Sequence, residues 1–328
     1  MPPLNPQTVA QLGALKLASL VDKTGEFTYR YSHKDNKQLA GYNPLRHAGT
    51  IWAMLDVYRT TKDEDILDAS KRAVTYLLNN YLRFYRDPNN LCICDGKAIK
   101  LGGSGLSTLA LLSLYEITGD EFLLTIARKL CDFVIKEREQ EGSFVHKRYF
   151  GSGKISEFQS SYYVGEALFG LLRCYEVTGD EKYLQAVLND LSDLEYYNYG
   201  VEEQSHWMLY TLAELHKHTN VRLAYKLAAR IAKHIIVHTE YIDEGRSTPT
   251  ACRSEGLLAF INMEHPKGAV DPLRLAALVR VKQNMTEQMK FLRSDGAFLR
   301  GGECERADEV RIDYIQHNIS SFIELSRL

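Results

Sequence analysis

The sequence has 328 residues, of which 45% are hydrophobic and 25% are charged, and its formal net charge is −2. These proportions are ordinary for a globular protein. The slightly negative net charge shows no excess of the basic residues that nucleic-acid-binding proteins usually have. No apolar run reaches the roughly 18 residues of a membrane span. The start, "MPPLNPQTVAQLG", has no basic region followed by an apolar one, so it does not read as a signal peptide. We therefore predict neither a nucleic-acid partner nor a membrane span.

The cysteine pattern favours a reducing compartment. The cysteines are Cys92, Cys94, Cys131, Cys174, Cys252 and Cys304. Cys131 and Cys174 fall on apolar faces of expected helices, where buried free thiols are the ordinary outcome. Cys92 and Cys94 form one C-x-C pair, which without a second pair is a weak metal signal. We predict a cytoplasmic protein that holds no structural zinc, no other metal and no cofactor.

Helical periodicity dominates the chain. Apolar residues recur at three- and four-residue spacing in twelve segments, which predicts twelve helices. In chain order these are 7–21, 46–58, 65–82, 105–117, 121–135, 165–177, 182–194, 206–215, 222–236, 254–261, 271–292 and 313–325. Short turns such as 60–65 and 218–220 join the two helices of a pair, and longer connections lead to the next pair.

One helix–turn–helix unit occurs twice. The stretch "LLSLYEITGDEFLL" at 111–124 matches "LLRCYEVTGDEKYL" at 171–184 in nine of fourteen positions, which indicates a repeated supersecondary unit. The glycine of each TGDE turn suits the left-handed end of one helix, and the aspartate suits the N-cap of the next. We expect the leucine pairs that open the two stretches to be buried between helix layers; these are Leu111, Leu112, Leu171 and Leu172.

Alternating short and long links describe six αα-hairpins. Six hairpins stacked in a closed ring bury a continuous core that one hairpin cannot. The more apolar, inner-ring helices are expected to begin near Arg46, Gly102, Ser161, Gln204, Arg253 and Asp313. Gly-x-Phe turns at 25–27, 142–144 and 296–298 predict short β-hairpins, which we expect to be the only sheet. Because no Pro/Gly/Ser-rich linker interrupts the chain, we predict one domain over residues 1–328.

The inner helices of such a ring all run in the same direction, so their N-termini surround one mouth. Ionisable groups open five of the six: Arg46, Arg253, Arg311, His47, His206, His317, Glu166, Glu203, Glu255 and Asp313. Tyr42, Tyr162, Tyr163 and Trp207 add flat apolar faces of the kind that pack against sugar rings. Helix N-termini and arginines favour an anionic or polyhydroxylated ligand. We predict that this mouth binds a sugar or glycan, anionic in character.

Each of these residues also has a simpler structural explanation. A histidine at a helix start is more often a cap or a packed core residue than a catalyst, and tyrosines there often only pack. An acid near a helix N-terminus complements the helix dipole by about 0.3–1 kcal/mol, which accounts well for Glu203 and fairly well for Asp313. It accounts less well for Glu166 and Glu255, because apolar residues follow each at once and an unpaired buried carboxylate is costly.

The repeat "GEALFGLLRCYEVTGDEKYL" and the Gly-x-Phe turns give nearly the whole chain a resemblance to the (α/α)6 toroid superfamily. The resemblance implies an all-α fold, an (α/α)6 toroid of six αα-hairpins with a few short β-hairpins in the connecting loops. The superfamily includes glycoside hydrolases, polysaccharide lyases, N-acylglucosamine 2-epimerases and uronyl C5-epimerase catalytic domains. Because several activities share these helical repeats, the resemblance fixes no reaction.

Our main hypothesis is an enzyme that hydrolyses glycosidic bonds of an acidic or N-acylated sugar through paired carboxylates. Glu166 or Glu255 would be the general acid, with a pKa raised by the apolar wall, and Asp313 would be the base. The arginines would hold the anionic group.

Two alternatives stay open. In a sugar epimerase or uronate lyase, a histidine (His47, His206 or His317) or a tyrosine would carry the acid–base chemistry. A non-catalytic toroid would instead bind glycan as a module of a larger biosynthetic protein, and the "MPPLNP" start would suit an excised domain. The sequence leaves a homodimer open as well.

Overall fold

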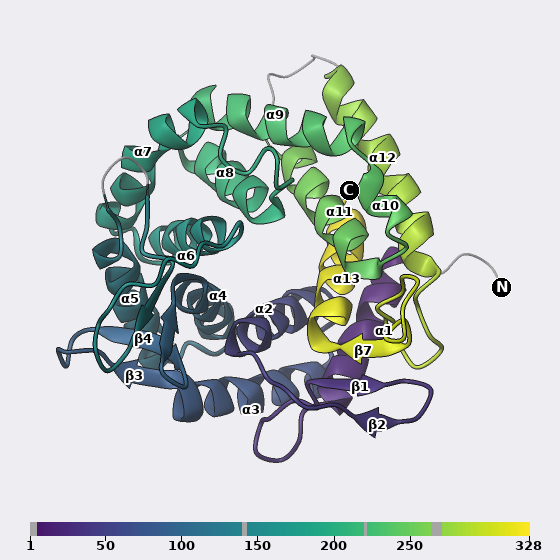
Figure 1. Ribbon diagram of the computed structural model, residues 1–328, viewed down its shortest axis with the longest axis horizontal. Helices are drawn as coiled ribbons and strands as arrows, with labels where there is room; N and C mark the ends of the chain where they lie inside the picture. The colour runs from purple at the N-terminus through teal and green to yellow at the C-terminus, as the bar shows by residue number, and fades with distance from the viewer. Residues whose placement is uncertain (1–4, 140–142, 220–221, 264–270) are drawn as a thin grey trace.

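The computed structural model describes residues 5–139, 143–219, 222–263 and 271–328. Its long helices form two concentric layers that close into a ring (Figure 1). The inner layer consists of α2 (Pro44–Thr61), α4 (Leu101–Thr118), α6 (Tyr163–Thr178), α8 (His206–Thr219), α11 (Ser247–Ile261) and α13 (Ile312–Leu325). The outer layer consists of α1 (Pro6–Ser19), α3 (Glu64–Tyr81), α5 (Glu121–Lys136), α7 (Glu181–Tyr196), α9 (Arg222–Val237) and α12 (Pro272–Met289).

This arrangement confirms the ring of six helical hairpins. A further short helix, α10 (Glu240–Asp243), precedes α11. The four leucines of the repeat are at most 1% exposed, as expected of residues between the layers. Across the described ranges, no helix has the length and hydropathy needed to cross a bilayer.

The turns of the repeat have the expected chemistry. Gly119 and Gly179 end α4 and α6 with φ values of 71° and 66°, in the left-handed region that favours glycine. Asp120 and Asp180 then accept hydrogen bonds from backbone N–H groups in the first turns of α5 and α7. At these turns the chain reverses direction, so that each of these inner helices is followed by an outer helix that packs beside it.

The sixth hairpin is made by the two ends of the described chain. Helix α1 packs against α13 and so completes the outer layer beside the last inner helix (Figure 1). At this contact Gly13 leaves no room for a side chain, because a Cβ there would overlap Ile319. The ring therefore closes through noncovalent contacts between its first and last helices.

One inner helix starts earlier than expected. Helix α11 begins at Ser247, so Arg253 lies within the helix instead of at its start. The first turn reads "STPT" and has no apolar periodicity, which hides it from a search by pattern. Pro249 is tolerated there because the first turn of a helix needs no donor from its N–H groups.

The few short strands in the connecting loops are as predicted, but the prediction that the Gly-x-Phe turns form the only sheet is wrong. One sheet has the order β2-β1-β7, made by β1 (Arg30–Ser32), β2 (Lys37–Gln38) and β7 (Glu309–Arg311). The other has the order β3-β4-β5-β6, made by β3 (Leu82–Phe84), β4 (Leu91–Asp95), β5 (Ala98–Lys100) and β6 (Lys147–Tyr149). The Gly-x-Phe turns form only isolated bridges, Val21 to Phe27, Arg138 to Phe144 and Leu292 to Phe298. Gly142 of the second turn lies outside the described residues.

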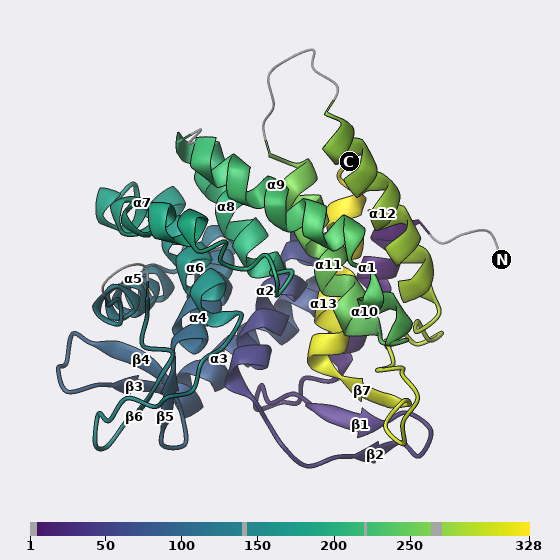
Figure 2. The same ribbon diagram turned by 45° about the horizontal axis from the view of Figure 1, so that its top comes forward.

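The strands lie at the mouth where the inner helices begin (Figure 2). β5 runs directly into α4, and β7 runs directly into α13. In the first sheet Arg30 of β1 pairs with Arg311 of β7, so segments from the two ends of the chain are fixed side by side. Two- to five-residue strands thus set the positions at which the inner helices start.

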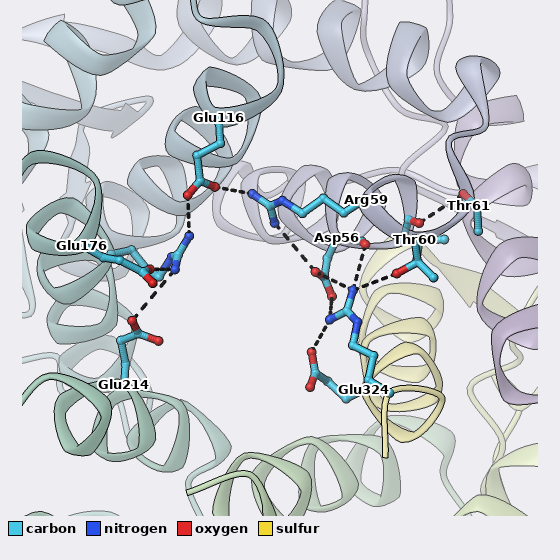
Figure 3. A network of polar contacts seen from close by, with 11 residues as sticks. Asp56, Arg59, Thr60, Thr61, Glu116, Glu176, Glu214 and Glu324 are labelled. Atoms are coloured by element: carbon cyan, nitrogen blue, oxygen red, sulfur yellow. Dashed lines mark hydrogen bonds and ion pairs between the residues drawn. The ribbon is translucent and has the colours of Figure 1, made fainter. Parts of the chain in front are cut away.

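At the opposite mouth, charged side chains near the C-terminal ends of the inner helices form an ion-pair belt (Figure 3). The belt consists of Asp56, Arg59, Glu116, Arg173, Glu176, Glu214, Glu324 and Arg327. Arg327 Nη2 lies 3.0 Å from Asp56 Oδ1, which joins α13 to α2. Arg59 joins α2 to Glu116 of α4, and Arg173 joins that same carboxylate to α6 and α8.

Candidate active site

A cavity of about 480 Å³ opens among the N-terminal parts of the inner helices. Ten of the fourteen residues predicted for the site line it: Arg46, Arg253, Arg311, His206, His317, Glu166, Asp313, Tyr162, Tyr163 and Trp207. They come from α2, α6, α8, α11 and α13 and from the segments just before these helices. The structure therefore brings together most of the groups that the sequence assigned to this mouth.

Four predicted residues lie outside the cavity lining: His47, Tyr42, Glu203 and Glu255. His47 is a buried residue of α2 that faces α3. Its Nε2 lies 2.8 Å from the carbonyl oxygen of Ala73 in α3, and its Nδ1 lies 2.7 Å from the Tyr42 hydroxyl. Burial lowers the pKa of His47 to about 4, so the ring is neutral. Tyr42 also accepts a hydrogen bond from Phe27 N–H. Glu203 is exposed in the loop before α8. His47 and Tyr42 thus bind the 25–27 turn to α2.

Glu166, in the first turn of α6, is the cavity-lining carboxyl that is held protonated. It is 6% exposed, and Oε2 has no hydrogen-bond partner among the described residues. Burial raises the pKa of Glu166 to about 8, although the charges of His317 and Arg46 act in the opposite direction. A carboxyl of this kind carries a proton at neutral pH and can donate it.

Glycines of α4 make the space that Glu166 occupies. A Cβ at Gly102 would overlap Glu166 Oε2, and a Cβ at Gly105 would overlap the Glu166 carbonyl oxygen. This explains the glycines in "LGGSG", the first residues of α4, none of which has an ionisable side chain. The segment contributes no functional side chain of its own because the neighbouring helix places its carboxyl there.

Asp313, at the start of α13, is held in the opposite protonation state. Arg311 donates to both of its oxygens, with Nη2 at 2.9 Å from Oδ2, and Arg46 Nε lies 3.0 Å from Oδ2. Burial alone would raise the pKa of Asp313, but the two guanidinium groups hold it below its ordinary value. Two carboxyl groups in one cavity therefore differ in protonation, which is the usual mark of separate acid and base roles.

Glu255 lies behind two histidines and does not line the cavity. It is fully buried, its Oε1 is 3.2 Å from His317 Nδ1, and its Oε2 is 3.6 Å from His206 Nε2. The rings of His206 and His317 are in edge contact, with centroids 5.2 Å apart. Glu255 therefore orients the histidines and has no direct access to a ligand in the cavity.

Arg253 is the predicted cavity arginine whose charge is not neutralised by a carboxylate. Among the described residues it forms no ion pair; its Nε donates to Gln204 Oε1 at 2.8 Å, and its guanidinium lies over the Tyr241 ring. Arg46 and Arg311, by contrast, are both engaged by Asp313. Of the three predicted arginines, Arg253 is therefore the one whose positive charge is available to an anionic group bound in the cavity.

The sequence analysis missed several lining residues, among them Cys252, Arg246, Thr248 and Gln316. Three of the four belong to α11 or to the residue before it, because that helix starts earlier than its apolar pattern shows. Pro249, the third residue of α11, follows two hydroxyl residues, and this was the sign of a helix start that the sequence offered.

Comparisons with known proteins agree with this architecture. Residues 40–192, just under half of the chain, match a family model described as "Beta-L-arabinofuranosidase, GH127 catalytic domain". No curated protein matches the chain. Three similar solved structures are a D-mannose isomerase, a cellobiose 2-epimerase from Bacillus thermoamylovorans B4167 and an unsaturated glucuronyl hydrolase from Bacillus sp. GL1.

The structural likeness extends over the whole chain. The isomerase has a TM-score of 0.76 at 10% identity and covers 100% of both chains. The epimerase has a TM-score of 0.73 at 15% identity, covering 98% of this chain and 99% of its own. The hydrolase has a TM-score of 0.72 at 15% identity, covering 98% of this chain and 97% of its own. Together with the ring of helices, these matches identify the chain as an (α/α)6 toroid.

Proposed function

We propose that this protein is a carbohydrate-active enzyme that hydrolyses a glycosidic bond, with Glu166 as general acid. The observation that carries the proposal is the buried Glu166 carboxyl at the cavity, whose Oε2 has no hydrogen-bond partner in the described chain and whose pKa is raised by burial to about 8. A proton held there is available to the leaving-group oxygen of a bound glycoside. The match of residues 40–192 to a glycosidase family model supports the same reaction class and includes Glu166.

Asp313 would supply the second carboxylate. Because Arg46 and Arg311 keep it ionised, it can act on a water molecule or stabilise the positive charge that develops on the sugar ring. In this role the two arginines serve Asp313, and Arg253 is left to bind an acidic group of the substrate. Tyr162, which is 40% exposed, and Tyr163 would pack against the sugar.

The contact between His206 and His317 weighs against an epimerase that uses this pair from opposite sides of the sugar. With ring centroids 5.2 Å apart, no sugar ring fits between them. Hydrolysis by the two carboxyl groups requires no such space. The two reactions also differ in a measurable way, since proton abstraction from carbon incorporates solvent deuterium into the recovered sugar and hydrolysis at the anomeric carbon does not.

The experiment is a hydrolysis screen with aryl glycosides, including L-arabinofuranosides, mannosides and unsaturated uronides, run in parallel in deuterated water with the free sugars. On a substrate that is turned over, Glu166→Gln should lower kcat by a factor on the order of 10²–10⁴, the usual share of general acid catalysis. Glu203→Gln is the matched control, because Glu203 is exposed outside the cavity. Deuterium incorporation without hydrolysis, or full activity of Glu166→Gln, would overturn the proposal.

The acidic-substrate part of the proposal has its own test. Arg253→Gln should raise KM for a uronide and leave KM for a neutral glycoside nearly unchanged, because only the former meets the guanidinium charge. Arg246→Gln is the control, since Arg246 lines the same cavity but is paired with Glu244 at 2.9 Å. Equal effects of Arg253→Gln on both substrates would assign Arg253 a structural role.

A further inference from the structure

Three metal-ligand side chains meet at the cavity wall from three different helices. His206 of α8, Cys252 of α11 and His317 of α13 each offer one ligand atom, and these atoms all lie within 4.8 Å of one another. Around a tetrahedral zinc ion, nitrogen and sulfur ligands lie about 3.3–3.8 Å apart. An ion would therefore need to draw the three atoms together by at most about 1.5 Å, which side-chain rotations can supply.

His206 has a polar atom that the protein leaves unsatisfied. Its side chain is 3% exposed, and within the described ranges its Nε2 has no hydrogen-bond partner. Glu255 Oε2, at 3.6 Å, is beyond hydrogen-bond distance. A buried nitrogen without a hydrogen-bond partner lowers stability by about 1–3 kcal/mol, so buried polar groups in folded proteins nearly always have a partner. A cation at this cluster would provide one.

Glu255 has the position of an outer-shell carboxylate. It is fully buried and contacts His317 Nδ1 at 3.2 Å, which directs the other ring nitrogen of His317 away from it. A histidine that binds a metal commonly donates its second N–H to a carboxylate in this way. The charges also balance, since one divalent ion offsets the Cys252 thiolate and the Glu255 carboxylate in a site with little water.

From these contacts we propose that His206, Cys252 and His317 form a binding site for a divalent transition metal, with zinc the best match to two imidazoles and one thiolate. All three residues line the cavity, so an ion held there would border the space where the sugar would bind. Three protein ligands with one open position is the pattern of a catalytic zinc site. The site rests on this geometry alone and does not depend on which sugar reaction the protein performs.

The chain contains a competing surface site that a good test must separate. His234 and His238 lie four residues apart at the end of α9, and their rings stack 4.1 Å apart, so they can also bind a metal, but without sulfur. Cobalt(II) distinguishes the two, because only a thiolate ligand produces a sulfur-to-cobalt charge-transfer band in the near ultraviolet. Cys304, the exposed cysteine, offers a matched control for Cys252.

The protein would be stripped with a chelator and titrated with Co²⁺, then with Zn²⁺ in competition. We expect a charge-transfer band that saturates at one equivalent, is displaced by Zn²⁺, persists in Cys304→Ser and His234→Ala, and disappears in Cys252→Ser. Glu255→Gln should weaken Zn²⁺ binding by about 10–100-fold, the usual effect of losing an outer-shell partner. Folding of each variant is checked by circular dichroism.

A second measurement covers the case in which Cys252→Ser does not fold. In the Cys304→Ser background, Zn²⁺ should protect Cys252 from alkylation, as mapped by peptide mass spectrometry. Absence of the charge-transfer band in the folded wild-type protein, or its survival in Cys252→Ser, would overturn the proposal. Alkylation of Cys252 at the same rate with and without Zn²⁺ would overturn it as well. None of these readouts requires enzymatic activity, so failure of the proposed hydrolysis would leave them unaffected.

Discussion

Replacing Glu166 by glutamine should stabilise the protein by an amount that grows with pH. In the unfolded chain this carboxyl ionises with a pKa near its ordinary value of 4.5, whereas burial in the cavity wall raises its pKa to about 8. Between these values the unfolded state is ionised while the folded state still holds the proton. Stability is therefore lost as pH rises through this window, because the unfolded state binds fewer protons than the folded state.

The size of the effect follows from the difference between the two pKa values. Each pKa unit corresponds to 1.36 kcal/mol, so the penalty is roughly 2 kcal/mol at pH 6 and on the order of 5 kcal/mol above pH 8, where it levels off. Glutamine has nearly the same shape and carries no ionisable proton, so the variant escapes this penalty. The calculation needs no reduction for solvent exposure, since the side chain is 6% exposed.

The assay is urea unfolding of wild type, Glu166→Gln and the exposed control Glu203→Gln, each at about pH 5.5, 7 and 8.5. The free energy of unfolding of Glu166→Gln should exceed that of wild type by a margin that widens with pH, and the control should follow wild type. A margin that does not change with pH would refute the raised pKa. A variant less stable than wild type at the alkaline end would show instead that Glu166 is an ionised partner of a buried cation.

Other perturbations should separate the roles of the remaining parts. Asp313→Asn should lower the free energy of unfolding, measured in urea, by up to about 3–5 kcal/mol, because it breaks the contacts with Arg46 and Arg311. Because the two guanidinium groups hold the pKa of Asp313 below its ordinary value, this stabilisation should be present above the ordinary pKa and disappear as pH falls through the folded-state pKa. Gly105→Ala should cost about 1–3 kcal/mol, since the new methyl group overlaps backbone of α6. Gly102→Ala should abolish activity with a smaller loss of stability, because its methyl group displaces the Glu166 side chain and not backbone. Equal losses of stability in the two glycine variants would contradict this difference. Arg173→Met should lower the free energy of unfolding by about 1 kcal/mol and make the melting temperature less sensitive to salt. An unchanged salt response would exclude a stabilising role for the ion-pair belt.

The repeat and the apolar periodicity were enough to predict the ring, because each helix is long enough to show its period several times. The sheets were missed because strands of two to five residues, such as Lys37–Gln38, are too short to show alternation. The start of α11 was missed because Thr248 and Pro249 carry no apolar period. These errors concern short or irregular segments, where sequence pattern contains little information.

At the site, sequence reasoning located the mouth but could not distinguish a packed residue from one that faces the cavity. His47 and Glu166 both follow a helix start, yet His47 turns toward Ala73 while Glu166 turns toward the cavity through the space at Gly102. The His206, Cys252 and His317 cluster has no ligand spacing along the chain, because each residue comes from a different helix. Which side chains converge there depends on helix rotation, and periodicity fixes helix rotation only to within a broad face.

The pairing of α1 with α13, and of β1 with β7, has a consequence for the order of events during synthesis. Arg46 leaves the ribosome well before Arg311 and Asp313, which lie more than 260 residues further along the chain. At about 5–20 residues per second, the wait between them is on the order of tens of seconds. Throughout that time α1 has no α13 to pack against, so the part of its buried face that contacts α13, which includes Gly13, is uncovered. The nascent chain is thus an open arc that a chaperone could bind, and it gains its arginine–aspartate contacts only when the last helix closes the ring.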